Sequence, residues 1–221
     1  MWVIPNVTPE FEERMFDVLD TYAKPYDQDQ PVICLDEKNH QLLSDIKKPI
    51  KMKPGKCLRI DYEYRREAVR NEFVVIEPKA GRRHIRTTNK RAGSDWAKLI
   101  GFITLKMYPE AKLIHIIEDN LNTHNIKYLY EVYGNDKAEA ILSRIEFHPT
   151  PKHASWLDMA EIEIGIFSRM VLGKRIATDK ELKRQKDAYV KNRNKVKAKI
   201  NWIFTRGQAI KKFKLETMCN N

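Results

Sequence analysis

The sequence contains few cysteines and no long apolar segment. Only three of its 221 residues are cysteine, and their spacing matches neither a disulfide framework nor a zinc site. We therefore expect Cys34, Cys57 and Cys219 to be reduced structural thiols in a cytosolic protein. No apolar run approaches the roughly 18 residues that a transmembrane helix needs, and the N-terminus is too polar for a signal peptide. We expect no membrane partner.

Acidic residues are in the minority. The chain has 41 Lys and Arg against 30 Asp and Glu, so its formal net charge is +11. This excess favours a polyanionic partner, although ribosomal and membrane-surface proteins share it. Most of the excess lies in residues 178–216, which hold thirteen Lys or Arg and four Asp or Glu. A capping box of Thr178 and Glu181 predicts a long basic helix there, which we expect to meet a nucleic-acid backbone.

Internal repeats and low-complexity tracts are also absent, and the apolar pattern indicates an α/β fold. Charged segments at 39–56 and 65–71 are predicted to be a basic loop and a basic turn. Strands are predicted at 31–38, 57–64, 72–77, 113–117 and 145–148, with an Arg-rich edge strand within 78–89. Helices are predicted from Thr8 to Lys24, at 94–107, 125–133, 136–143 and 157–167, and beyond Thr178.

This order of elements predicts a ribonuclease H-like mixed β-sheet of about five strands with helices on both faces, followed by a basic helical C-terminal tail. Residues 1–30 are expected to be an N-terminal segment with one helix. Residues 31–172 are expected to form the core, and 173–221 a basic helical extension that Trp202, Ile203 and Phe204 anchor to the body.

Carboxylates end two of the most apolar strands: Asp36 lies near the end of the strand predicted at 31–38, and Asp119 follows the strand predicted at 113–117. Acidic groups at the carboxyl ends of central strands lie where α/β folds place their chemistry. The helix at 157–167 can add a third acid, either Asp158, Glu161 or Glu163. Glu161 lies one turn from Asp158, whereas Glu163 projects roughly the other way. Converging carboxylates need a counter-charge, and hard divalent cations supply it.

Three segments resemble the catalytic blocks of DDE transposases: CLDEK at 34–38, EDNLNTH at 118–124 and HPTPKHASWLDMAEIEI at 148–164. The resemblance is to the bacterial insertion-sequence (family six-thirty) branch of the mariner superfamily, and it spans nearly the whole chain. It implies that Asp36, Asp119 and Glu161 hold two Mg²⁺, which Mn²⁺ can replace, about 3.5–4 Å apart for an in-line phosphodiester displacement. Asp158 replaces the Asn of the family's Leu-Asn-x-x-Glu block, which leaves the choice among the three acids of this helix open.

The resemblance also implies supporting residues. Asn120, Asn122 and His124 match the second block, and we expect them to orient Asp119 or to contact DNA. His148 and His153 are expected either to contact phosphate or to form structural hydrogen bonds, and Trp156 to plug the start of the helix. The residues expected to contact DNA are Lys38, Lys53, Arg82, Arg83, Lys152, His153, Lys183, Arg184, Lys191 and Arg193.

The implied function is that of a transposase core, which hydrolyses a phosphodiester at each element end and joins the freed 3′-hydroxyl to target DNA. The implied partners are double-stranded DNA, a homo-oligomer on that DNA, and a separately encoded N-terminal helix-turn-helix part. The implied setting is the nucleoid in a bacterial or archaeal cytoplasm. Two alternatives remain open: a ribonuclease H-fold nuclease or resolvase, and an inactive or domesticated DNA-binding remnant.

Overall fold

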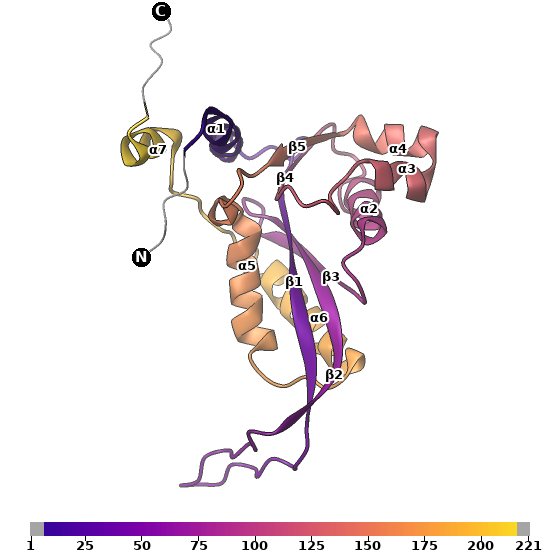
Figure 1. Cartoon of the computed structure of the whole chain (residues 1–221), viewed down its shortest axis with the longest axis vertical. Helices are drawn as coiled ribbons and strands as arrows, with labels where there is room; N and C mark the ends of the chain where they lie inside the picture. The colour runs from indigo at the N-terminus through magenta and orange to yellow at the C-terminus, as the bar shows by residue number, and fades with distance from the viewer. Residues whose placement is uncertain (1–6, 216–221) are drawn as a thin grey trace, which may run out of the picture.

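The computed structural model describes residues 7–215 and contains one mixed five-stranded sheet (Figure 1). The strand order is β3-β2-β1-β4-β5, in which β1 pairs antiparallel with β2 and parallel with β4. This arrangement is ribonuclease H-like, so the predicted fold class is confirmed. The strands are β1 (Val32–Asp45), β2 (Tyr64–Glu77), β3 (Arg82–Thr88), β4 (Ile114–Glu118) and β5 (Ile145–Pro149).

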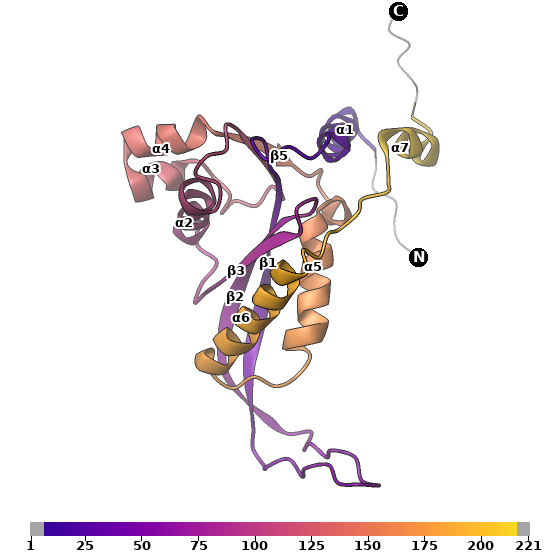
Figure 2. The same cartoon turned by 180° about the vertical axis from the view of Figure 1, so that it is seen from behind.

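Helices cover both faces of the sheet (Figures 1 and 2). Side chains alternate along β1, so Ile33 and Leu35 pack beneath α2, α3 and α4, whereas Val32 and Cys34 face α1 and the start of α5. Further along the second face, α5 and α6 cover Val74 of β2. The helices are α1 (Pro9–Ala23), α2 (Gly93–Phe102), α3 (Lys127–Tyr133), α4 (Asn135–Leu142), α5 (Met159–Phe167), α6 (Asp179–Lys195) and α7 (Arg206–Phe213).

The hairpin of β1 and β2 is longer than the sequence predicts. Residues 39–45 and 65–71 are predicted to be a loop and a turn, but they belong to the paired strands β1 and β2. Of the strand predicted at 57–64, only Tyr64 lies in a strand, as the first residue of β2. Residues 46–63 form an exposed extension with two isolated bridges. Charged residues are tolerated in this part of β2 because cross-strand pairing satisfies the backbone while the side chains remain largely exposed. Residues 57–63 alternate between apolar and polar side chains, but Leu58 and Ile60 are exposed. The alternation therefore does not create a buried face in this segment.

The basic C-terminal segment packs against the body. The Thr178 side chain caps α6 by accepting a hydrogen bond from the Glu181 amide, as predicted. The reciprocal half of the predicted capping box does not form, because the Glu181 carboxylate accepts from Arg184 and Gln185 instead. Trp202 packs on Tyr22 with ring centroids 5.2 Å apart, and Phe204 packs on Trp156 at 5.6 Å, as the sequence predicts. The prediction is wrong for Ile203, which is 82% exposed. The boundaries at residues 30 and 172 remain predictions.

The cysteines differ in exposure. Cys34 is buried with a free thiol in the core, as expected, whereas Cys57 lies exposed in the 46–63 extension rather than in a strand. Cys219 lies outside the described residues. None of the helices within residues 7–215 is long and apolar enough to cross a membrane.

Candidate active site

Asp36 of β1 and Asp119, the residue that follows β4, lie level with each other in neighbouring parallel segments. The register of β1 and β4 pairs Cys34 with Ile117, and both chains then continue for two residues to the two aspartates. Asp36 lies on the face of Cys34, which is also the face that α5 covers. The fold therefore places these two carboxylates side by side at the edge of the sheet where β4 ends, although β1 continues to Asp45 and Asp36 does not end its strand as the sequence predicts.

The start of α5 adds two more acids to this edge. The Tyr22 hydroxyl fixes the helix start by donating to the Leu157 carbonyl at 2.8 Å. Asp158 is the N-cap residue, whose carboxylate accepts from the Ala160 amide at 2.7 Å, and its side chain is buried. Glu161 lies in the first turn and is exposed. Both acids are near enough to Asp36 to affect its charge.

The carboxylates destabilise one another's ionised forms. Burial raises the pKa of Asp36 to about 8, with further contributions from Glu161, Glu37 and Asp119. Burial, together with the nearby Asp36, also raises the pKa of Asp158 well above its ordinary value. Among the described side chains, Asp158 Oδ2 is buried and accepts no hydrogen bond. These oxygens lack positive partners, which is the setting that a hard divalent cation fits.

His124 supports the cluster from the opposite face of the sheet. Its Nε2–H donates to Glu37 Oε1 at 2.8 Å, and its Nδ1 lies 3.0 Å from the Asp119 carbonyl oxygen and 3.1 Å from Asp119 Oδ1. Burial alone would lower the pKa of His124, but the bonds to Asp119 and Glu37 outweigh it and raise the pKa to about 11. The His124 imidazolium therefore links Asp119 of the carboxylate cluster to Glu37 of β1.

Sequence reasoning missed three residues of this support. Glu37 is buried against His124, and Glu118 accepts a hydrogen bond from Trp96 Nε1 at 2.9 Å. Burial raises the pKa of Glu118 to about 7. Trp96 also stacks on His124 with centroids 5.8 Å apart. Glu37 and Glu118 adjoin the predicted ligands in sequence, but only the fold shows that they face the other side of the sheet.

The sequence match decides the family. A profile of the DDE superfamily endonucleases matches residues 31–183, more than half of the chain. The chain belongs to the DDE superfamily endonucleases. The acids of the carboxylate cluster all lie within the matched residues: Asp36, Asp119, Asp158 and Glu161. No curated protein sequence matches this DDE endonuclease.

Structures of the Mos1 mariner transposase share its fold. The Mos1 strand transfer complex superimposes with a TM-score of 0.59 and 13% identity, covering 95% of this chain and 61% of that one. The Mos1 paired-end complex with the left transposon end gives a TM-score of 0.57, 13% identity, and coverage of 95% and 61%. A Mos1 paired-end complex with Mn gives 0.55 and 12%, covering 90% and 60%. This DDE endonuclease chain thus spans about three fifths of the length of Mos1.

Glu163 does not belong to the carboxylate cluster of the DDE endonuclease. Its fully buried carboxylate pairs with Arg83 at 2.8 Å and Arg193 at 3.0 Å, and accepts from the Tyr189 hydroxyl at 2.6 Å. The prediction that Arg83 contacts DNA is therefore wrong, because its side chain is completely buried. The Arg193 side chain is only 19% exposed and its guanidinium pairs with Glu163 in the same cluster, so we exclude it from the DNA surface as well.

The other residues predicted to contact DNA remain at the surface. Lys38 follows Asp36 on the same face of β1 and is half-buried, and Lys53 lies in the exposed 46–63 extension. Lys152 and His153 are exposed in the turn before α5. Lys183, Arg184 and Lys191 are exposed on α6, where Lys183 pairs with Asp187 and Arg184 with Glu181. Asn120 and Asn122 are exposed on the loop after β4, and their roles remain predictions.

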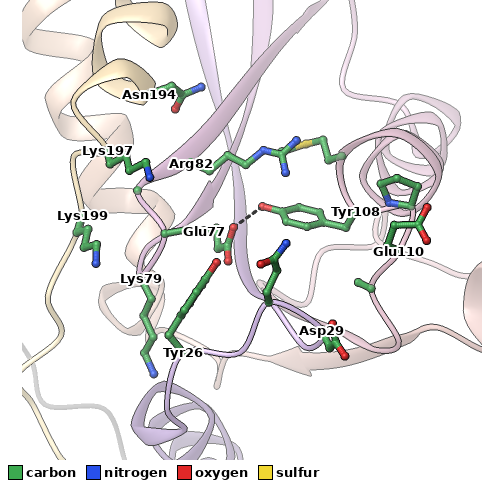
Figure 3. A pocket seen from close by; sticks show the side chains of 16 residues that line it. Tyr26, Asp29, Glu77, Lys79, Arg82, Tyr108, Glu110, Asn194, Lys197 and Lys199 are labelled. Carbon is green, nitrogen blue, oxygen red and sulfur yellow. Dashed lines mark hydrogen bonds between the residues drawn. The ribbon is translucent and has the colours of Figure 1, made fainter.

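Arg82 lies at a separate cavity of about 680 Å³ beside the β2–β3 turn (Figure 3). Its guanidinium lies 4.7 Å from the centroid of the Tyr108 ring, and the Tyr108 hydroxyl donates to Glu77 at 2.8 Å. Glu77 and Arg82 are cross-strand partners on the face of the sheet opposite Asp36. This cavity is therefore distinct from the carboxylate cluster.

Proposed function

We propose that this DDE endonuclease is the catalytic core of a transposase, of the bacterial insertion-sequence branch of the mariner superfamily that its motifs resemble. It would hydrolyse a phosphodiester at each element end and transfer the freed strand into target DNA. The observation that carries this proposal is the convergence of Asp36, Asp119 and Glu161 at one edge of a ribonuclease H-like sheet. The Mos1 structures that share this fold are paired-end and strand-transfer complexes.

The residues at this edge fit divalent cations. Asp158 Oδ2 is buried without a hydrogen bond, and the pKa of Asp36 is raised to about 8 when no cation is present. Carboxylate oxygens are the ligands that Mg²⁺ and Mn²⁺ prefer. We propose that Asp36, Asp119 and Glu161 hold two Mg²⁺, with Mn²⁺ as a substitute. When bound, such ions activate water and stabilise charge on phosphoryl oxygens.

The different exposure of Asp158 and Glu161 suggests different roles for these two acids. One oxygen of Asp158 caps α5, and the buried side chain has little freedom to move. Glu161 is exposed in the next turn and can turn its carboxylate towards Asp36. We therefore assign Glu161 as the third ligand and Asp158 as the residue that positions it.

The remaining site residues hold groups in place or bind DNA. His124 keeps one oxygen of Asp119 in a fixed direction and joins it to Glu37. Lys38, Lys152 and His153 lie in segments next to the acids. At these positions their side chains would bind the phosphates of the strand that is cleaved. Lys53, Lys183, Arg184 and Lys191 would extend that contact along double-stranded DNA, on which we expect a homo-oligomer to assemble in a bacterial or archaeal cytoplasm.

The test is cleavage and joining of labelled double-stranded DNA with Mg²⁺ or Mn²⁺. Wild type is compared with Asp119→Asn, and with Glu139→Gln, which alters an exposed acid on α4. We expect cleaved and joined products from wild type and Glu139→Gln, and none from Asp119→Asn. Cleavage without joining would indicate the nuclease or resolvase alternative. DNA binding without cleavage would indicate an inactive remnant.

A further inference from the structure

Two histidines and a glutamate meet on β4 and β5, away from the carboxylate cluster. His115 of β4 is the register partner of Glu146 on β5, and His148 lies two residues further on, so all three point to the sheet face beneath α1. His115 and His148 are buried, whereas the Glu146 side chain is 52% exposed. His115 precedes Asp119 by four residues.

Hydrogen bonds connect these side chains to one another and to α1. His148 Nδ1–H donates to Asp17 of α1 at 2.7 Å, which leaves His148 Nε2 as an acceptor. His115 Nδ1 lies 3.0 Å from that Nε2 and 3.1 Å from Glu146 Oε2, so its proton faces both. Lys24 Nζ lies 3.5 Å from His115 Nε2.

The same three atoms match the dimensions of a zinc site. The separations are 3.0 Å between His115 Nδ1 and His148 Nε2, 3.1 Å between His115 Nδ1 and Glu146 Oε2, and 3.9 Å between His148 Nε2 and Glu146 Oε2. The circle through three points with these separations has a radius of about 2.0 Å, which is the length of Zn–N and Zn–O bonds. Small rotations of the half-exposed Glu146 side chain can move its carboxylate and bring the three ligand atoms closer to the tetrahedral geometry that zinc prefers.

We propose that His115, Glu146 and His148 form a zinc-binding site of the His₂Glu type, with water as the fourth ligand. Zinc would replace the shared proton on His115 Nδ1, which moves to Nε2 or to solvent, and the exposed Lys24 would turn away. Asp17 already holds His148 by its other nitrogen, as carboxylates commonly do for metal-bound histidines. Among the described residues, no Lys or Arg forms an ion pair with Glu146.

Zinc bound here would join three elements. The ligands lie on β4 and β5, and Asp17 ties the site to α1. The site would therefore stabilise β4, the strand that leads to Asp119, without contributing to the proposed reaction. The spacing of the two histidines in the sequence, 33 positions apart, gives no indication of it.

The experiment measures zinc affinity of the purified full chain in excess Mg²⁺, by competition with a chromophoric chelator. Wild type is expected to bind one Zn²⁺, and Co²⁺ to give the intense visible absorption of a four-coordinate site. Asp17→Asn should weaken zinc about 10- to 100-fold, and Glu146→Gln and His148→Gln by at least as much. Asp119→Asn, at the carboxylate cluster, should bind zinc as wild type does.

Two results would overturn the proposal. One is a wild type that binds no zinc or shows only weak six-coordinate cobalt absorption. The other is zinc binding that survives Glu146→Gln but is lost in Asp119→Asn, which would place the ion at the carboxylates. Glu146 is half-exposed, so its variant remains informative even where His148→Gln unfolds, and circular dichroism checks the fold of each variant.

Discussion

Asp158 caps α5 and adds a buried carboxyl group beside Asp36. Asparagine caps a helix as well as aspartate does, whereas alanine does not. We expect Asp158→Asn to retain DNA cleavage and Asp158→Ala to be about 1 kcal/mol less stable than Asp158→Asn in denaturant unfolding. Glu161→Gln should fold normally and lose cleavage. Loss of cleavage in Asp158→Asn but not in Glu161→Gln would exchange the roles of the two acids.

The carboxyl groups also make stability depend on pH. The pKa of Asp36 is about 8 in the metal-free fold, against about 4 in an unfolded chain. Between these values the folded chain keeps a proton that the unfolded chain has released, so the free energy of unfolding falls as pH rises from about 4 to about 8. His124, with its pKa raised to about 11, adds a decline of the same sign only above about pH 6.5.

Thermal unfolding in a chelator measures this dependence. We expect the melting temperature to fall between pH 4.5 and 6.5, where His124 contributes no slope, and Asp36→Asn to reduce that fall. Millimolar Mg²⁺ should raise the melting temperature more at pH 8 than at pH 5, because the ion binds the ionised carboxylates. Burial lowers the pKa of His84 to about 4, which adds a slope of the opposite sign in this window, so the comparison with Asp36→Asn is decisive. The same pH dependence in wild type and Asp36→Asn would show that Asp36 is ionised without a cation.

At the scale of elements, one buried ion cluster joins β3, α5 and α6. Removing one member of a fully buried pair costs about 3–5 kcal/mol, whereas an exposed helix pair is worth at most about 1 kcal/mol. We therefore expect Arg83→Met, which leaves Glu163 with fewer partners, to lower the free energy of unfolding by several kcal/mol. Arg184→Met, which breaks the exposed pair with Glu181, should change it by less than about 1 kcal/mol. Equal effects in urea unfolding would contradict a structural role for Arg83.

The same elements show where sequence reasoning works and where it stops. β4 was predictable because its apolar run is local, and Asp36 and Asp119 because they end such runs. The charged half of β2 could not be predicted as a strand, because its pairing with β1, and not its own composition, keeps it extended. Arg83 resembled a DNA contact because its partner Glu163 lies 80 positions away in sequence. Glu37 and His124 likewise meet only across two strands and a loop.

At the scale of the whole molecule, the affinity for DNA can depend on the net charge alone or on which surface carries the charge. Lys183, Arg184 and Lys191 are exposed on α6, on the sheet face that also carries Asp36. Lys98, Lys127 and Lys137 are exposed on α2, α3 and α4, on the opposite face. Changing either set to Gln lowers the net charge by the same amount, so the two triple variants form a matched pair.

We expect only the α6 triple variant to bind DNA more weakly. Each lost phosphate contact should reduce the slope of log affinity against log salt concentration by about 0.9. The opposite-face variant should keep the wild-type slope, because cations that do not meet phosphate release no counterions on binding. Fluorescence anisotropy across a salt series measures both slopes. Equal losses in the two variants would mean that the net charge of +11 attracts DNA without a defined surface, and the role assigned to α6 would then fail.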